Sequence, residues 1–192
     1  GKCARTADLT DEEKAAVYDM FLLTMKPTLY VANVDEDTIA DGTNKYVEIV
    51  KKYADEEKSE VVVICGKFEA DLAEIDDPAD RKDFMESVGL KESGLAVLAR
   101  KAYHLMGLRT FFTGGPDECR AWTIHNGDKA PRAAGVIHTD FEKGFIKAEA
   151  YTIDDLRQYK DEASIKAAGK YRQEGKEYVV QDGDVLFFKF NN

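Results

Sequence analysis

The chain has 192 residues and a formal net charge of −10 at pH 7, a size that fits one large or two small domains with a sizeable core. The acidic balance argues against a general nucleic-acid binder and against sequence-specific DNA recognition, because phosphate contacts require clustered Lys and Arg. Three distant cysteines predict neither a disulfide framework nor a zinc site and favour a cytoplasmic protein, and no apolar run approaches the roughly 20 residues of a membrane span.

The first predicted elements are a helix and a buried strand. Residues 11–24 begin with acidic residues behind Thr10 and have apolar residues at helical spacing, which predicts one helix that ends before Pro27. The apolar run 29–32 does not alternate with polar residues, which is typical of a buried strand in a parallel sheet. It ends on the polar cluster 33–36, and open α/β sheets bind ligands at the carboxyl ends of their strands.

Helices and strands continue to alternate up to about residue 107. Residues 45–54 predict an amphipathic helix with Tyr46, Ile49, Val50 and Tyr53 facing inward. The run 61–64 predicts a second buried parallel strand, which is followed by a loop at Cys65 and Gly66. Three further helices are expected at residues 68–75, 80–88 and 93–106. This alternation indicates a parallel α/β sheet.

From Gly107 onward the predicted elements are shorter and separated by turns. Strands are expected at residues 108–112, 120–124, 145–152, 177–181 and 185–190, and helices at 133–139 and 153–169. Asp182 and Gly183 predict a tight turn between the last two strands. We therefore predict an α/β domain followed by an α+β domain in which a mixed sheet wraps a helix.

Several motifs resemble the YchF (Obg-like ATPase) family. They lie at residues 24–36, which contain the Asn-x-x-Glu pattern 33–36, and at 111–115, 120–122, 135–145 and 178–185. The resemblance implies the returning end of a helical coiled-coil arm at 1–17. It also implies the C-terminal half of a P-loop nucleotidase parallel sheet at 18–107 and a β-grasp TGS domain at 108–192. The intact protein would bind ATP with Mg²⁺, or GTP as the alternative, hydrolyse it slowly and associate with ribosomes.

The resemblance assigns base reading to Asn33, Val34 and Glu36, with Cys65 and Gly66 beside them. A carboxamide offers an acceptor and a donor together, which matches N6 and N7 of adenine. Glu36 is one methylene longer than the Asp of the guanine-reading pattern Asn-Lys-x-Asp, which implies a preference for ATP. The alternative is that Asn33 caps the next turn and Glu36 is a surface acid. Cys65 is expected to be a small packing residue at the strand end.

The motifs that hold phosphate and magnesium are absent from the sequence. Neither Gly-x-x-x-x-Gly-Lys-Ser/Thr nor Asp-x-x-Gly occurs in the 192 residues. We therefore assign no catalytic residue and no metal ligand, and expect the C-terminal portion of a longer ATPase that is inactive by itself. His104, His125 and His138 have no metal-ligand spacing, and His138 is expected at a helix end with local hydrogen bonds.

Basic residues are enriched in the second half of the sequence. The resemblance implies contact with RNA or the ribosome, for which Lys143, Lys147, Lys170 and Arg172 are candidates. Tyr151, Tyr159 and Tyr171 are candidate platforms for base stacking. The alternative is a solvated surface of mixed charge. A stand-alone RNA- or ribosome-binding module and a regulatory domain that senses a small ligand also stay open as functions.

Overall fold

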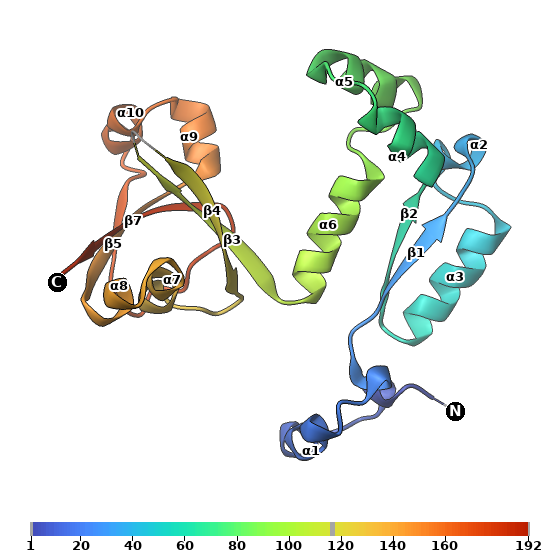
Figure 1. Ribbon diagram of the computed structural model, residues 1–192, viewed down its shortest axis with the longest axis horizontal. Helices are drawn as coiled ribbons and strands as arrows, with labels where there is room; N and C mark the ends of the chain where they lie inside the picture. Colours follow the sequence, from blue (N-terminus) through green and yellow to red (C-terminus); the bar gives the residue numbers. More distant parts are fainter. Residues whose placement is uncertain (1, 116–117, 192) are drawn as a thin grey trace. The chain divides into compact units, whose positions relative to one another are not determined.

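The protein is described by a computed structural model that covers residues 2–115 and 118–191. It divides into two compact units, Gly1–Met106 and Gly107–Asn192, whose elements are labelled in Figure 1. Gly1 and Asn192, the outer ends of the first and last predicted segments, lie outside the described residues. Within the described ranges, no helix is both long and apolar enough to cross a membrane.

The N-terminal unit has a pair of parallel strands at its centre. Strands β1 (Leu29–Asn33) and β2 (Glu60–Ile64) pair in parallel, with Val31 opposite Val62. The helical segments of this unit are η1 (Ala4–Thr6), α1 (Asp11–Val17), η2 (Tyr18–Met20), η3 (Leu23–Met25), α2 (Glu36–Ile39), α3 (Lys45–Glu56), α4 (Gly66–Ala73), α5 (Pro78–Ser87) and α6 (Gly94–Leu105). Helices α3 and α6 pack on opposite sides of the strand pair (Figure 1). The predicted α/β class of this half is confirmed.

The predicted helix at residues 11–24 is wrong beyond Val17. It begins as expected, because Thr10 and Glu13 form a reciprocal capping box. Beyond Val17 the chain continues as the short turns η2 and η3, and between them Phe21 has a left-handed φ of 47°, which interrupts any helix. The side chains of Tyr18, Phe21 and Leu23 are more than 70% exposed. Nothing in the described unit therefore provides a surface on which a longer helix would pack.

Helix α3 includes the predicted residues, but the sheet covers only part of the face that was predicted to point inward. Val47 and Ala54 are buried, whereas Tyr46, Ile49 and Tyr53 are all more than half exposed. The apolar face of this helix is wider than the two strands that it meets. The strand β1 is likewise only partly covered, because Val31 is 45% exposed.

A polar cluster around Glu57 attaches the start of the chain to the sheet. Glu57 Oε2 accepts hydrogen bonds from Arg5 Nη2 at 2.6 Å and from Tyr30 Oη at 2.8 Å. Its Oε1 accepts from Cys3 Sγ and from Tyr53 Oη, both at 3.2 Å. These donors, Tyr30 first and then Arg5, lower the pKa of Glu57 from 4.5 to about 2.

We expect acid to release this attachment between about pH 4.5 and pH 2. The pKa of Glu57 is depressed in the folded protein, so its stabilising contribution is fully present above pH 4.5 and is lost as the pH falls through about 2. An NMR titration of the Glu57 carboxyl carbon checks this. The substitution Tyr30→Phe removes one donor and is expected to move the midpoint upward; an unchanged midpoint would contradict the assigned cause.

The C-terminal unit is a five-stranded mixed sheet in the order β4-β3-β7-β5-β6. Its strands are β3 (Leu108–Gly114), β4 (Cys119–His125), β5 (Phe145–Thr152), β6 (Arg172–Glu174) and β7 (Asp184–Phe190), and its helices are α7 (Ala130–Ile137), α8 (Thr139–Lys143), α9 (Ile153–Tyr159) and α10 (Glu162–Ala167). The central pair β3–β7 is parallel and the other pairs are antiparallel. Helix α7 covers one face over a core that includes Phe111, Leu186 and Phe188. The predicted α+β class is confirmed.

Both predicted helices of this unit are interrupted. The helix expected at 133–139 begins earlier, at Ala130, and ends at Ile137, where His138 caps α8 by accepting from Asp140 N at 3.2 Å. The local hydrogen bond predicted for His138 is thus confirmed. The helix expected at 153–169 breaks at Lys160, which has a left-handed φ of 72°. Asp161 then caps α10, since short carboxylates favour such cap positions over helix interiors.

The strand predicted at residues 177–181 is wrong. Only an isolated bridge between Val179 and Lys129 forms there, and the described strand is β6, which pairs with β5. The physical reason is the side chain of Tyr178, whose hydroxyl donates to the buried carboxylate of Asp184 at 2.7 Å. This contact turns the segment inward. The predicted turn at Asp182 and Gly183 is present, and Gly183 has the positive φ of 82° that favours glycine.

Asp184 is the fully buried centre of a second polar cluster. Its Oδ2 accepts from Tyr178 Oη and from Gln181 N at 2.9 Å, and its Oδ1 accepts from Arg172 Nη2 at 3.3 Å. Burial, and then the bond to Asp184, raise the pKa of Tyr178 to about 12. Tyr178 therefore remains a hydrogen-bond donor at neutral pH.

Candidate functional site

The carboxyl ends of β1 and β2 lie side by side. Asn33 is opposite Ile64 at the last step of the parallel ladder, and Val34 N donates to Ile64 O at 2.8 Å. The polar cluster that follows β1 and the loop that follows β2 therefore leave the sheet at the same edge. This is the arrangement expected for neighbouring parallel strands.

A hydrogen bond joins the two loops. Asn33 Oδ1 accepts from Gly66 N at 2.9 Å. This N–H lies at the start of α4, where backbone donors have no acceptor within the helix itself. A Cβ at position 66 would lie 3.3 Å from Asn33 Oδ1, so glycine suits this close approach. The capping role considered for Asn33 belongs to Asp35, whose side chain accepts from Thr38 N at 2.9 Å. Hydrogen bonds from Thr38 lower the pKa of Asp35.

This bond decides what Asn33 can offer to a base. Its carbonyl oxygen already accepts from Gly66, so the carboxamide N–H groups are what the exposed side chain presents outward. An N–H donor suits the N7 acceptor, which adenine and guanine share. Asn33 in this conformation therefore favours a purine without distinguishing the two, and the selection between them must depend on other groups.

Glu36 forms an ion pair across the same edge. Its Oε2 accepts from Lys67 Nζ at 2.6 Å, and this bond raises the pKa of Lys67. Both side chains are exposed, and an exposed ion pair is weak because water and salt screen the charges. A ligand can therefore separate them at little cost. Lys67 was not predicted from the sequence. The signal that could have identified it is its positive charge, opposite in sign to Glu36, directly after the loop at Cys65 and Gly66.

Val34 and Cys65 lie below this edge, in the core. Cys65 is buried with Phe68 and Leu72, and Val34 packs against the same cluster. The packing role predicted for Cys65 is thus confirmed. Of the five candidate residues, the structure brings Asn33, Glu36 and Gly66 together at the surface, and Val34 and Cys65 support them from inside.

Glu69 anchors this region to the next helix and was not predicted. It is buried, and it accepts from Gly94 N at 2.6 Å and from Leu95 N at 3.3 Å at the start of α6. A Cβ at position 94 would lie 2.7 Å from Ile64 Cγ2, so only glycine fits. Helix α4, whose first residue contacts Asn33, is in this way fixed to both the strand and α6.

The structure provides no metal centre at this edge. Among the side chains it describes, no group of three or more His, Cys, Asp or Glu residues could hold a metal ion. The residues present therefore fit the base of a nucleotide but not the magnesium ion that accompanies its phosphates.

The candidate RNA-contacting residues of the C-terminal unit differ in their surroundings. Lys143 and Lys170 are exposed. Lys147 donates to Gln173 Oε1 at 3.0 Å, and Arg172 belongs to the Asp184 cluster. Lys143 and Lys170 are therefore the better placed of the four for contact with another molecule.

The three tyrosines predicted to stack on bases make contacts within the C-terminal unit. The rings of Tyr151 and Tyr171 stack on each other with centroids 5.7 Å apart. Their hydroxyls donate to Glu162 at 3.4 Å and to Glu149 at 3.0 Å, respectively. Tyr159 packs against the same buried cluster. The contact between Tyr151 and Tyr171 occupies one face of each ring, and stacking of the three rings on bases stays a prediction.

Comparisons with known proteins agree over nearly the whole chain. Residues 108–191 match a family model described as "YchF-GTPase_C: Protein of unknown function (DUF933)". The chain is 49% identical over 191 residues to "Ribosome-binding ATPase YchF" of Bacillus subtilis, covering 99% of this chain and 52% of that protein. It is 44% identical over 186 residues to "Obg-like ATPase 1" of Xenopus laevis, covering 96% and 46%.

A solved structure gives the same result. The fold matches the YchF GTPase of Schizosaccharomyces pombe with a TM-score of 0.83 and 37% sequence identity, covering 98% of this chain and 50% of that one. The chain spans about half the length of the relatives it matches.

Proposed function

The chain belongs to the YchF and Obg-like ATPase family, and from this premise we propose that it supplies the base-reading edge of an ATP site together with a ribosome-contacting β-grasp domain. The observation that carries this assignment is the hydrogen bond between Asn33 Oδ1 and Gly66 N. It holds the two strand-end loops in contact and leaves the carboxamide N–H groups to face a purine. Relatives named as ribosome-binding ATPases support the same reading.

The parts of the ATP site are divided between this chain and residues that its sequence does not contain. Asn33 donates to N7 of the purine, and the Glu36–Lys67 pair borders the base. Charge neutralisation during phosphoryl transfer would require ligands for the phosphates and magnesium, which the described residues at this edge do not provide. The phosphate-binding motif is missing from the 192 residues, so the proposed role of this chain is selection and orientation of the base.

We expect the chain alone to bind ATP weakly and to hydrolyse none. A base contact without phosphate contacts gives little affinity against the cost of ordering the ligand. In an ¹⁵N NMR titration with ATP, the Gly66 amide and the Asn33 carboxamide are expected to shift, and Asn33→Ala abolishes the response.

Asn44→Ala serves as the matched control. Asn44 caps α3 through Tyr46 N and Val47 N and belongs to neither of the two strand-end loops, and its loss should leave the ATP response unchanged. Phosphate release above a no-protein blank would contradict the expected lack of turnover, and an equal loss in both variants would contradict the site.

For the C-terminal unit, exposed lysines support contact with a ribosomal component. This unit carries 13 Lys and Arg residues against 14 Asp and Glu residues, so nearly all of the net charge of −10 lies in the N-terminal unit. Phosphate contacts by exposed lysines are therefore less opposed here than over the chain as a whole.

We expect Lys143→Glu combined with Lys170→Glu to weaken co-sedimentation with ribosomes several-fold at low salt, because two positive charges become negative. Arg172 is left unchanged, since its loss would disturb the Asp184 cluster. The control carries the same charge change at Lys14 and Lys82 in the N-terminal unit. Equal binding by the two double variants would show that Lys143 and Lys170 are ordinary solvated surface residues that do not contact the ribosome.

A further inference from the structure

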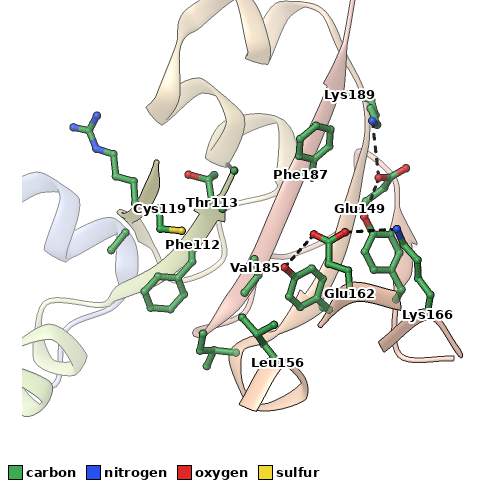
Figure 2. Close-up of a pocket in the computed structure, with 17 residues that line it drawn as sticks. Phe112, Thr113, Cys119, Glu149, Leu156, Glu162, Lys166, Val185, Phe187 and Lys189 are labelled. Atoms are coloured by element: carbon green, nitrogen blue, oxygen red, sulfur yellow. Dashed lines mark hydrogen bonds and ion pairs between the residues drawn. The ribbon is translucent and has the colours of Figure 1, made fainter. Parts of the chain in front are cut away.

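The second face of the C-terminal sheet contains a cavity of about 940 Å³. Figure 2 shows the side chains that line it, which come from β3, β4, β5, β7 and the helices α9 and α10. Pockets for small organic ligands have volumes of roughly 300–1,000 Å³ and a mainly apolar lining with a few polar groups. All lining residues belong to this unit, and none of them is a candidate residue of the Asn33 edge.

The apolar floor of the cavity exists because this face of the sheet is only partly covered. Helices α9 and α10 bury Tyr151, Ile165 and Val185. Phe187, two residues further along β7, is left 50% exposed. The neighbouring strands contribute the small residues Gly114 and Ala121 to the lining. A large half-exposed ring beside small residues leaves space for a flat group to stack.

The charged residues of the lining favour an anion. They are Arg120, Glu149, Glu162, Lys166 and Lys189. Glu149 accepts from the Tyr171 hydroxyl, and its carboxylate lies 4.0 Å from Lys189 Nζ. Glu162 lies 3.6 Å from Lys166 Nζ. Glu162 accepts from the Tyr151 hydroxyl, and both lysines lie beyond hydrogen-bond distance of these acids, so their N–H groups are available to a ligand. The guanidinium of Arg120 lies over the Trp122 ring, 4.2 Å from its centroid, and is not counted among the cations of the cavity.

The two lysines also lie over aromatic rings of the lining. Lys189 Nζ is 4.2 Å from the centroid of Phe187, and Lys166 Nζ is 4.3 Å from that of Tyr171. Such contacts hold the ammonium groups at the wall of the cavity, beside the apolar floor. A ligand ring on Phe187 would place an attached anionic group next to Lys189.

We propose that this cavity binds a small planar aromatic anion, with its ring against Phe187 and its anionic group at Lys189 and Lys166. A cationic group at this wall would face the ammonium groups of Lys166 and Lys189, and an uncharged ring would remove water from the lysines without pairing them. The tyrosines that would serve a nucleic-acid strand are already stacked on each other, which favours a small molecule over RNA.

The test compares two probes with the same rings. Anilinonaphthalene sulfonate carries an anionic group, and N-phenyl-naphthylamine lacks it. By titration calorimetry with the full chain, the sulfonate is expected to bind one-to-one, and the uncharged probe at least roughly tenfold more weakly, since charge-assisted contacts are the strong ones. Equal affinity of the two probes would overturn the anion requirement.

Matched variants test whether the sulfonate probe binds in this cavity. Phe187→Ala and Lys189→Gln should each weaken the sulfonate several-fold. Ile146→Ala removes a similarly exposed apolar side chain from β5, and Lys176→Gln removes an exposed lysine; neither residue lines the cavity, and neither change should matter. Equal weakening by the cavity variants and the controls would show unspecific adsorption and overturn the site.

Cys119 gives an independent readout of position. It lines the cavity and is exposed, whereas Cys65 is buried. Alkylation of Cys119 by iodoacetamide, followed by peptide mass spectrometry, should slow when the sulfonate is saturating. An unchanged alkylation rate, or displacement of the sulfonate by a single-stranded RNA oligonucleotide at lower concentration than by small aromatic anions, would overturn the proposal.

Discussion

Replacing Asp184 by Ala is expected to destabilise the C-terminal unit by about 3 kcal/mol, the scale of removing one partner from a buried charged network. Tyr178 Oη and Gln181 N would lose their acceptor inside the protein. Arg172 would lose less, because its side chain is 40% exposed and keeps Glu174 at 3.2 Å. Most of the cost is therefore assigned to Tyr178 and Gln181 N, whose bonds to Asp184 are partly buried.

Urea unfolding followed by tryptophan fluorescence measures this effect in the right unit, because Trp122 is the single tryptophan of the chain and belongs to β4. Asp154→Ala is the matched control, since Asp154 is exposed and pairs only with its neighbour Arg157 in the known ion pairs of the described residues. This substitution is expected to change the free energy of unfolding by no more than about 0.5 kcal/mol. A similar loss in both variants would show that the Asp184 cluster contributes nothing special.

In a family member that also carries the phosphate-binding half, Val34→Lys with Glu36→Asp is expected to shift the ratio of ATP to GTP affinity toward GTP by roughly tenfold or more. Asn33 offers an N–H to an acceptor common to both purines, so it does not select. A shorter carboxylate at position 36 can accept from guanine N1–H and N2–H. One relative is named an ATPase and another a GTPase, so the family leaves the choice of base open.

The substitutions Val34→Lys and Glu36→Asp are expected to contribute unequally to the shift in the ratio of ATP to GTP affinity. Val34 packs against the core below the edge, so a lysine there must extend its stem along apolar surface to reach water. Glu36→Asp alone should therefore give most of the shift. Lys67→Ala frees Glu36 without changing its length and serves as the control. Titration calorimetry with both nucleotides gives the ratio, and an unchanged ratio in the double variant would place selection in backbone contacts.

The sequence was sufficient for contacts that follow from strand order. Asn33 is the last residue of β1 and Gly66 lies two residues beyond the end of β2. The carboxyl ends of neighbouring parallel strands lie at the same edge of a sheet. The ion pair of Glu36 with Lys67 and the anchoring of α6 by Glu69 were not predicted. Both depend on the direction in which α4 leaves the sheet, which hydrophobic periodicity does not specify.

Periodicity also fails where a side chain has a stronger partner elsewhere. Residues 177–181 have strand composition, yet Tyr178 bonds to Asp184 and the segment turns. Apolar spacing likewise predicted one helix over 153–169, but Asp161 caps a new helix there. For α3, the apolar periodicity correctly predicted a helix. It did not predict which part of the apolar face of this helix the two strands cover.

The position of β7 has a consequence for how this protein is made. β7 lies between β3 and β5, and its residues 184–190 are translated after every other strand of the sheet. On the ribosome the hairpin of β3 and β4 can form early, but the centre of the sheet stays empty until β7 emerges. During that interval both β3 and β5 present unpaired edges, which are prone to wrong pairing. Non-local pairing of this kind folds slowly, so nascent chains that stall before residue 184 are expected to be substrates for chaperones.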